Sequence, residues 1–339
     1  MTDGFLVMDK PPGITSHDVV AVARAVTGLQ KVGHTGTLDP FATGVLPLAL
    51  GGATRLIQYL DESEKIYDAV IALGKLTDTG DPTGVVIAEA PVPHLLRGEV
   101  ERVLASFVGA RMQRPPRYSA VKIKGKPLYE YARKGQDVVA EPRPIRIDAM
   151  DLHPSFEAGS SRIRVLIRCS RGTYARVIAE EVAEALGTVG HLDELRRDGS
   201  GPFRIEHALP MSRLSEIVAD NPAWHEVLRP ARQGERIPWK ARDQVFAGLQ
   251  PYLISPREAL KHIPAITLSA LEARRFQTTG QFPPAPIADA KAWLLLSGDE
   301  LLGVGTAAKS STEPLQWERG AARPAGDQPR DLSRGPRRR

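Results

Sequence analysis

The sequence predicts an α+β fold, and two observations support this prediction. Segments typical of strands and of helices are interleaved along the chain without the regular strand–helix–strand repeat of a doubly wound parallel sheet. Residues 162–168 alternate arginine with apolar side chains at almost every position, which is typical of a half-buried antiparallel strand. The length of 339 residues favours roughly two domains.

The boundaries of the expected elements follow from apolar runs and from capping and turn residues. The predicted strands cover residues 5–9, 67–73, 84–90, 162–168, 292–296 and 301–306. The predicted helices run from an N-cap at Ser16 to Gly28, over 99–108, over about 174–186, and from an N-cap at Ser269 to Thr278. Gly298 and Asp299 are expected to join the last two strands as a hairpin.

The composition is that of an ordinary globular protein, since 42% of the residues are hydrophobic and 25% are charged. A net charge of +5 and a pI of about 9.3 favour an anionic partner. The one cysteine, Cys169, excludes an intramolecular disulfide and argues against a cysteine-based metal site. The N-terminus lacks a signal-peptide pattern, and no apolar segment reaches the ~18 residues of a membrane span. We therefore expect a soluble cytoplasmic protein.

One carboxylate, Asp39, is the only acidic side chain in residues 33–56. Gly33 and Gly36 precede it and allow positive φ or the close approach of another molecule. Pro40 follows it and pushes Asp39 toward an extended conformation. The segment therefore predicts a bent, reactive or ligand-facing loop that leads into a buried element.

A basic segment with interleaved tyrosines lies between residues 111 and 135. Its basic residues are Arg111, Arg114, Arg117, Lys122, Lys124, Lys126, Arg133 and Lys134, and its one acid is Glu130. Tyr118, Tyr129 and Tyr131 lie among these cations. Spaced cations can neutralise phosphates, and aromatic rings can stack on exposed bases. A solvated charged loop with tyrosines in the core is an equally good interpretation of this segment taken alone.

Several motifs resemble those of one enzyme family. Residues 33–40 and 42–46 closely resemble the signature of the TruB family of tRNA pseudouridine synthases. Further segments resemble the family's other motifs in the family's order: 10–16 at the N-terminus, 114–122 with Gly125, Tyr129 and 132–133 in an RNA-binding insertion, 169–176 in a second active-site strand, and 191–197 in a pocket wall. The resemblance covers residues 5 to about 205.

The resemblance implies the isomerisation of uridine 55, in the T-loop of tRNA, to pseudouridine. It also implies a pseudouridine synthase fold, in which helices flank a central mixed, largely antiparallel sheet. No cofactor and no metal take part in this reaction. A carboxylate nucleophile attacks either the sugar or the base, and the sequence leaves both routes open.

The resemblance assigns three catalytic residues. Asp39 matches the nucleophile, and Arg176 matches the guanidinium that keeps this carboxylate ionised. Tyr67 matches the tyrosine that stacks on the base. The alternatives from the residues alone are that Arg176 is a surface residue of its helix and that Tyr67 is a core residue.

The resemblance also assigns substrate contacts. Tyr174 and Leu195 would line the uracil pocket, although Leu195 alone is more typical of a core. His34 would fill the gap that the flipped base leaves in its stack. Lys10 and Pro11 would support the Asp39 loop, and Thr37 would contact substrate. The RNA-binding residues would be Arg114, Arg117, Tyr118, Lys122, Lys124, Lys126 and Arg133.

The expected organisation has four parts. Residues 1–210 form the catalytic domain with its insertion at about 111–150, 211–262 a connecting segment, 263–309 a small β-rich, PUA-like RNA-binding domain, and 310–339 a disordered Arg-rich tail. The expected partner is the T-arm of tRNA, with no guide RNA, no membrane and a monomeric chain. Two alternatives stay open: a guide-RNA-dependent enzyme, which would share the Asp39 loop, and a tRNA-binding folding factor with secondary or lost catalysis.

Overall fold

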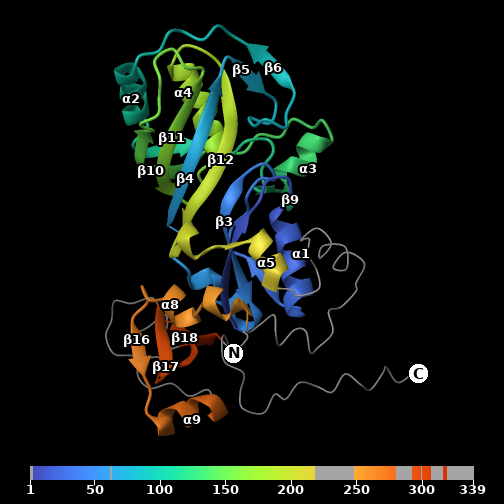
Figure 1. Cartoon of the computed structure of the whole chain (residues 1–339). Helices are drawn as coiled ribbons and strands as arrows, with labels where there is room; N and C mark the ends of the chain where they lie inside the picture. The colour runs from blue at the N-terminus through green and yellow to red at the C-terminus, as the bar shows by residue number, and fades with distance from the viewer. Residues whose placement is uncertain are drawn as a thin grey trace, which may run out of the picture.

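The computed structural model describes residues 3–61, 63–217, 248–279, 292–298, 300–306 and 316–318, and its centre is one large sheet (Figure 1). The main strands are ordered β14-β1-β3-β12-β4-β11-β10-β7, while β2, β13 and β15 pair with β3, β12 and β1. Among the described strands of this sheet, only the β1–β14 and β3–β12 pairs are parallel. The predicted α+β fold with a mixed, largely antiparallel sheet is therefore confirmed.

The elements are bounded as follows. The strands of the large sheet are β1 (Gly4–Lys10), β2 (Val32–His34), β3 (Thr43–Leu50), β4 (Glu64–Leu73), β7 (Gly109–Gln113), β10 (Arg143–Leu152), β11 (Arg162–Ser170), β12 (Gly190–Ser200), β13 (Phe203–Arg204), β14 (Leu209–Pro210) and β15 (Leu253–Ile254). Two small hairpins are formed by β5 (Lys75–Thr77) with β6 (Val86–Glu89) and by β8 (Lys122–Ile123) with β9 (Lys126–Pro127). The helices are α1 (Ser16–Thr27), α2 (Arg97–Ser106), α3 (Leu128–Arg133), α4 (Ala175–Ala185), α5 (Met211–Ile217), α8 (Pro256–Ala259) and α9 (Ala270–Thr279).

Each predicted strand and helix is present, with ends within three residues of the expected positions. One predicted cap was wrong: Thr15, not Ser16, is the N-cap of α1. The Thr15 hydroxyl accepts a hydrogen bond from the Asp18 amide, and the Asp18 carboxylate accepts one from the Thr15 amide. This reciprocal pairing needs an acidic residue three positions after the cap, and only Thr15 has one there. Ser16 is the first helical residue and bonds to the Asp39 loop instead.

The antiparallel pair of β1 and β3 is buried on both faces. Leu6, Met8 and Leu48 pack into the main core with α1. The alternate positions, such as Phe5 and Val45, pack into a second cluster. Because side chains alternate across a strand, this double burial explains why β3 is apolar at nearly every position.

Helices α2 and α4 lie against the other half of the large sheet (Figure 1). Val100 of α2 and Ile178 and Val182 of α4 contribute to the main core, together with Ile71 of β4 and Val165 of β11. The opposite face of β4, β11 and β12 carries ion pairs, such as Arg164 with Asp68. One face of this half is therefore apolar and the other is polar.

The C-terminal module is a four-stranded sheet with α9 beside it. Its strands are β16 (Ala265–Thr267), β17 (Ala292–Ser297), β18 (Glu300–Thr306) and β19 (Gln316–Glu318). Strands β17 and β18 form the predicted antiparallel pair, although Asp299 of the predicted turn lies outside the described residues. Leu294, Leu296 and Val304 belong to the same apolar cluster as Phe5 and Val45, so the module shares a core with the large sheet.

The described parts of the connecting segment pack onto the large sheet. Leu249 is buried in the main core, and β15 pairs with β1. Residues 218–247 of this segment lie outside the described residues, and so does the Arg-rich tail except for β19. No helix in the described ranges is long and apolar enough to cross a membrane.

We predict that Gly44→Ala destabilises the protein more than Gly187→Ala does. Both glycines have positive φ, +99° and +81°, which costs a residue with a Cβ about 1–2 kcal/mol. A Cβ on Gly44 would also overlap the backbone of Arg197, with the Arg197 amide nitrogen at 2.8 Å, whereas a Cβ on Gly187 would meet nothing within 4 Å. Urea unfolding should show a loss of about 1 kcal/mol for Gly187→Ala and about 3 kcal/mol or more for Gly44→Ala. Equal losses would contradict the close β3–β12 approach.

Candidate active site

The loop that carries Asp39 joins β2 to β3 and is bonded to neighbouring segments through its backbone. The Thr35 amide donates to the Pro47 carbonyl at 3.1 Å, which continues the β2–β3 ladder. At the other end of the loop, the Gly13 amide donates to the Pro40 carbonyl at 2.8 Å. Asp39 therefore sits between two backbone attachments.

Lys10 is the last residue of β1, is fully buried and hydrogen-bonds to this loop. Its ammonium donates to the carbonyls of Pro11, Ile14 and Pro40 at 2.9, 2.8 and 3.1 Å. Burial lowers the pKa of Lys10 from 10.5 to about 8, although the charge of Asp39 opposes this shift. Lys10 is therefore bound to the loop through Pro40, and all three of its protons are directed at backbone oxygens.

Two more side chains bind the loop backbone. The Leu38 amide donates to the Ser16 hydroxyl at 2.9 Å. Arg197 of β12 is 2% exposed and donates to the carbonyls of Gly36, Thr37 and Val45 at 3.2, 3.2 and 2.8 Å. Sequence reasoning missed the role of Arg197, because a run of charged residues in a strand gives no sign that one of them is buried against a loop about 160 positions away.

The Asp39 carboxylate forms an ion pair with Arg176 of α4. The Arg176 Nε lies 2.9 Å from Asp39 Oδ2, and Nη2 lies 3.4 Å from Oδ1. The Asp39 side chain is 35% exposed, whereas Arg176 is 5% exposed. The structure therefore brings these two predicted residues together, with a buried cation behind a carboxylate that solvent and substrate can reach.

Backbone carbonyls hold the Arg176 guanidinium in place. Nη1 donates to the Thr79 carbonyl at 2.8 Å, and Nη2 donates to the Tyr118 carbonyl at 2.9 Å. A second buried carboxylate, Asp81, lies 3.8 Å from Nη1. Asp81 was also missed, since nothing in the sequence links the 78–84 turn to Arg176.

The pKa of Asp39 is raised above its ordinary value. Burial is the main cause, and Arg176 opposes it while the charge of Asp81 adds to it. The site therefore combines a carboxylate that is partly withdrawn from water with a fixed cation that favours its ionised form.

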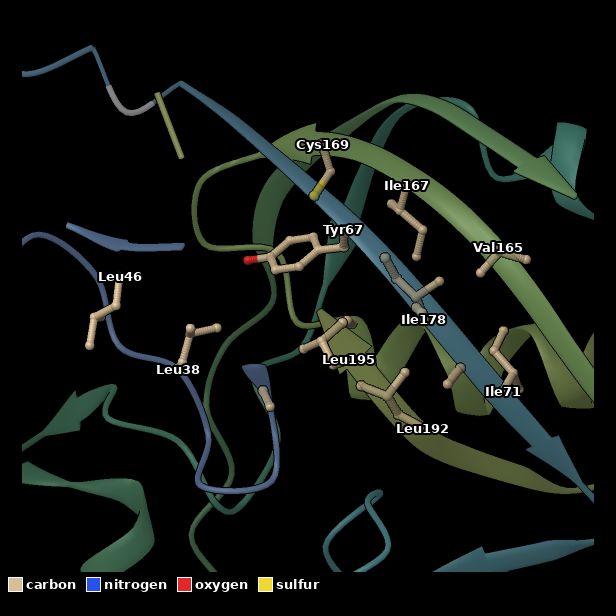
Figure 2. Packing of buried hydrophobic residues seen from close by; sticks show 14 of the residues in the cluster. Leu38, Leu46, Tyr67, Ile71, Val165, Ile167, Cys169, Ile178, Leu192 and Leu195 are labelled. Carbon is tan, nitrogen blue, oxygen red and sulfur yellow. The ribbon is translucent and has the colours of Figure 1, made fainter. Parts of the chain in front are cut away.

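Tyr67 and Leu195 lie in the core beside the loop, as Figure 2 shows. The Tyr67 hydroxyl points from β4 toward the segment with Leu38 and Leu46 (Figure 2). Burial raises the pKa of Tyr67, and the Arg197 guanidinium opposes this shift. The phenol is therefore neutral at pH 7. Tyr67 is a core residue and also lies next to the Asp39 loop.

Tyr174 precedes α4 and is half-buried. Its backbone amide donates to the Gln113 Oε1 at 2.8 Å, and its carbonyl accepts from the Gln113 Nε2 at 3.1 Å. Burial raises the pKa of the Tyr174 hydroxyl, while Ser119, Arg143 and Arg176 oppose the shift. Gln113 is a further residue that sequence reasoning missed.

The remaining predicted substrate residues lie around the loop. His34 ends β2 and is half-buried, with its ring edge-on to that of His17 at 6.0 Å between centroids. Burial is the main cause of a lowered His34 pKa, and His17 adds to it. Thr37 is exposed and Pro11 is half-buried, and their carbonyls accept from Arg197 and Lys10.

A cavity of about 780 Å³ adjoins the loop. Pro40, Phe41 and Leu195 line it, together with Asp68 and Arg164 from the polar face of the sheet. Asp39 and Tyr67 do not line it, so the cavity is a neighbour of the ion pair and not its pocket. No group of three or more His, Cys, Asp or Glu side chains in the described ranges could hold a metal ion.

The basic segment projects from the end of β7 next to this site. Its predicted RNA-binding cations are exposed: Arg114, Arg117, Lys122, Lys124, Lys126 and Arg133. Lys124 has φ of +49° in the turn between β8 and β9, where it protrudes with Gly125. The Arg133 guanidinium lies over the Tyr129 ring at 5.2 Å, and the Tyr118 carbonyl contacts Arg176. The cationic surface is therefore joined directly to the Asp39–Arg176 pair.

Comparison with known proteins identifies the family. Residues 24–175 match the model of the N-terminal domain of the TruB family of pseudouridylate synthases. The chain is 43% identical over 278 residues to tRNA pseudouridine synthase B of Geobacter sulfurreducens, which covers 80% of each chain. It is 37% identical over 297 residues to the protein of the same name from Psychrobacter cryohalolentis, which covers 81% of each.

Solved structures show the same fold. A chain of an H/ACA ribonucleoprotein bound to a substrate RNA containing 2′-deoxyuridine superposes with a TM-score of 0.64 at 23% identity, over 95% of this chain and 86% of that one. A chain of a Cbf5–Nop10–Gar1 complex superposes with a TM-score of 0.61 at 26% identity, over 94% and 82%. These likenesses and the family match confirm the predicted pseudouridine synthase fold. The chain belongs to the TruB family of pseudouridylate synthases.

Proposed function

We propose that this chain converts uridine 55 in the T-loop of tRNA to pseudouridine, as a monomer without cofactor or guide RNA. The observation that carries the proposal is the half-exposed Asp39 carboxylate 2.9 Å from the buried Arg176 guanidinium. Relatives that share 43% and 37% identity with most of the chain are tRNA pseudouridine synthases B. The ion pair and the family match both support this proposal.

The reaction rearranges one uridine and leaves its composition unchanged. Asp39 attacks the sugar or the base and forms a C–O bond, the N1–C1′ bond breaks, the base turns, and a C5–C1′ bond forms. The bond to Asp39 then breaks, which restores the free carboxylate. The proton on C5 is released and N1 gains one, so atoms and electrons balance. Arg176 favours the ionised form of Asp39 that this attack needs, and its bonds to the Thr79 and Tyr118 carbonyls hold it in place.

Substrate binding needs the target base to leave its stack, which costs a few kcal/mol. His34, on the rim of the loop, would fill the vacated space, and Tyr67, Tyr174 and Leu195 would enclose the uracil. The exposed cations of the basic segment would bind phosphates of the T-arm. The C-terminal module would act as a PUA-like RNA-binding domain.

The proposed reaction can be tested by tritium release. A T-arm hairpin with tritium at C5 of its uridines, including U55, should release one equivalent to water when purified protein is added alone. A hairpin with cytidine at position 55 should release none, because the other uridines are not substrates. Asp39→Asn should abolish release, because it removes the carboxylate nucleophile, and should keep hairpin affinity within about twofold, because it is isosteric and leaves the exposed cations of the basic segment in place. Binding without release by the wild type would favour the folding-factor alternative.

The salt dependence of binding tests the basic segment. Changing Lys122, Lys124 and Lys126 to Gln should weaken hairpin binding and reduce the slope of log K against log salt by about 2 to 3, because each phosphate contact contributes about 0.7–0.9. The matched control changes three exposed cations elsewhere, Lys75, Arg102 and Lys261, to Gln. An identical slope in the two triple variants would refute the assigned role of these lysines.

A further inference from the structure

Gln113 is a buried polar residue at the place where β7, the basic segment and the start of α4 meet. It ends β7, is 3% exposed and lies near the start of the basic segment, next to Arg114. Its amide exchanges two hydrogen bonds with the backbone of one residue, Tyr174, at 2.8 and 3.1 Å. A buried amide is costly unless it is hydrogen-bonded, and here both bonds fix the backbone of position 174.

The two hydrogen bonds fix the start of α4. Tyr174 is the N-cap residue of this helix and makes no side-chain capping bond of its own. The Gln113 Oε1 accepts from the Tyr174 amide, and the Tyr174 carbonyl accepts both from Gln113 and from the Ile178 amide at 3.2 Å. Because the planar Gln113 amide bonds to both the N–H and the C=O of Tyr174, it restricts the rotation of the Tyr174 backbone as well as its position.

The fixed start of α4 determines two groups of the candidate site. The half-buried Tyr174 ring projects from the residue that Gln113 holds, and Arg176 follows two positions later. The Tyr118 carbonyl, five residues after Gln113, accepts from the Arg176 guanidinium at 2.9 Å. The segment 113–118 therefore contacts α4 at both Tyr174 and Arg176.

We propose that Gln113 is a positioning residue, which holds the Tyr174 ring in place against the uracil during catalysis. This inference rests on the proposed function. It assigns to Gln113 an effect on the rate of the chemical step and not on the affinity for tRNA. A residue that only anchored the basic segment would have the opposite effect, because that segment supplies the phosphate contacts.

The test uses Gln113→Met, which preserves length and volume and removes both hydrogen bonds. The single-turnover rate of tritium release from the T-arm hairpin should fall by roughly 10- to 100-fold, the scale of a displacement near 1 Å in a catalytic site. The Kd for the hairpin should stay within about twofold of wild type. If the Met variant does not fold, Gln113→Asn serves instead, because it withdraws the amide by one methylene, and the same separation of rate from Kd is expected.

A double-mutant cycle supplies the decisive control. In a Tyr174→Leu background, Gln113→Met should change the single-turnover rate by less than about threefold, because the ring is gone and Arg176 is held separately by the Thr79 and Tyr118 carbonyls. The proposal would be overturned if Gln113→Met lowered the rate as much in that background as in the wild type. It would also be overturned if Gln113→Met increased the Kd for the hairpin and left the rate unchanged. Absence of tritium release by the wild type would instead refute the proposed function, so the two failures are distinct.

Discussion

The ion pair between Asp39 and Arg176 is the constraint on which the site depends. Removing two charges from water is unfavourable, and breaking a buried pair leaves one charge without compensation. Here the guanidinium is almost fully buried, and a second carboxylate, Asp81, shares it. The carbonyls of Thr79 and Tyr118 occupy its other protons, so Arg176 stays beside Asp39. The carboxylate is thus partly buried and is held beside a fixed cation.

The surrounding structure positions the Asp39 loop through its backbone. Lys10 from β1, Ser16 from α1 and Arg197 from β12 all bond to main-chain atoms of the loop. Lys10 and Arg197 come from strands that both pair with β3, and Ser16 comes from the helix that follows β1. Gly44 lets β3 approach the Arg197 backbone, which links the packing of the sheet to the place of the carboxylate. The loop is therefore fixed by the sheet itself.

Sequence patterns predicted the strands that alternate or are uniformly apolar, such as β1, β4 and β11, and the motifs located Asp39 and Arg176. They did not predict β12, because its acidic and basic side chains on the polar face mask the buried Leu192, Leu195 and Arg197. Arg197, Asp81 and Gln113 were missed because their partners lie far away in the sequence. Gln113 is 61 positions from Tyr174 and Arg197 is 161 positions from Gly36, and no local pattern marks such contacts. The N-cap of α1 was misplaced for a simpler reason. Thr15 and Ser16 are adjacent and both carry a hydroxyl, and the reciprocal bonds with Asp18 make Thr15 the cap.

Burial raises the pKa of Asp39, and the Arg176 guanidinium limits this rise. Carbon-13 NMR titration of labelled aspartate carboxyls, in the wild type and in Arg176→Met, measures both effects. We expect the wild-type Asp39 to titrate above 3.8 and the variant to titrate higher still, because desolvation remains when the guanidinium is removed. Asp39→Asn identifies the resonance. A wild-type value at or below 3.8, or an unchanged value in the variant, would contradict the account.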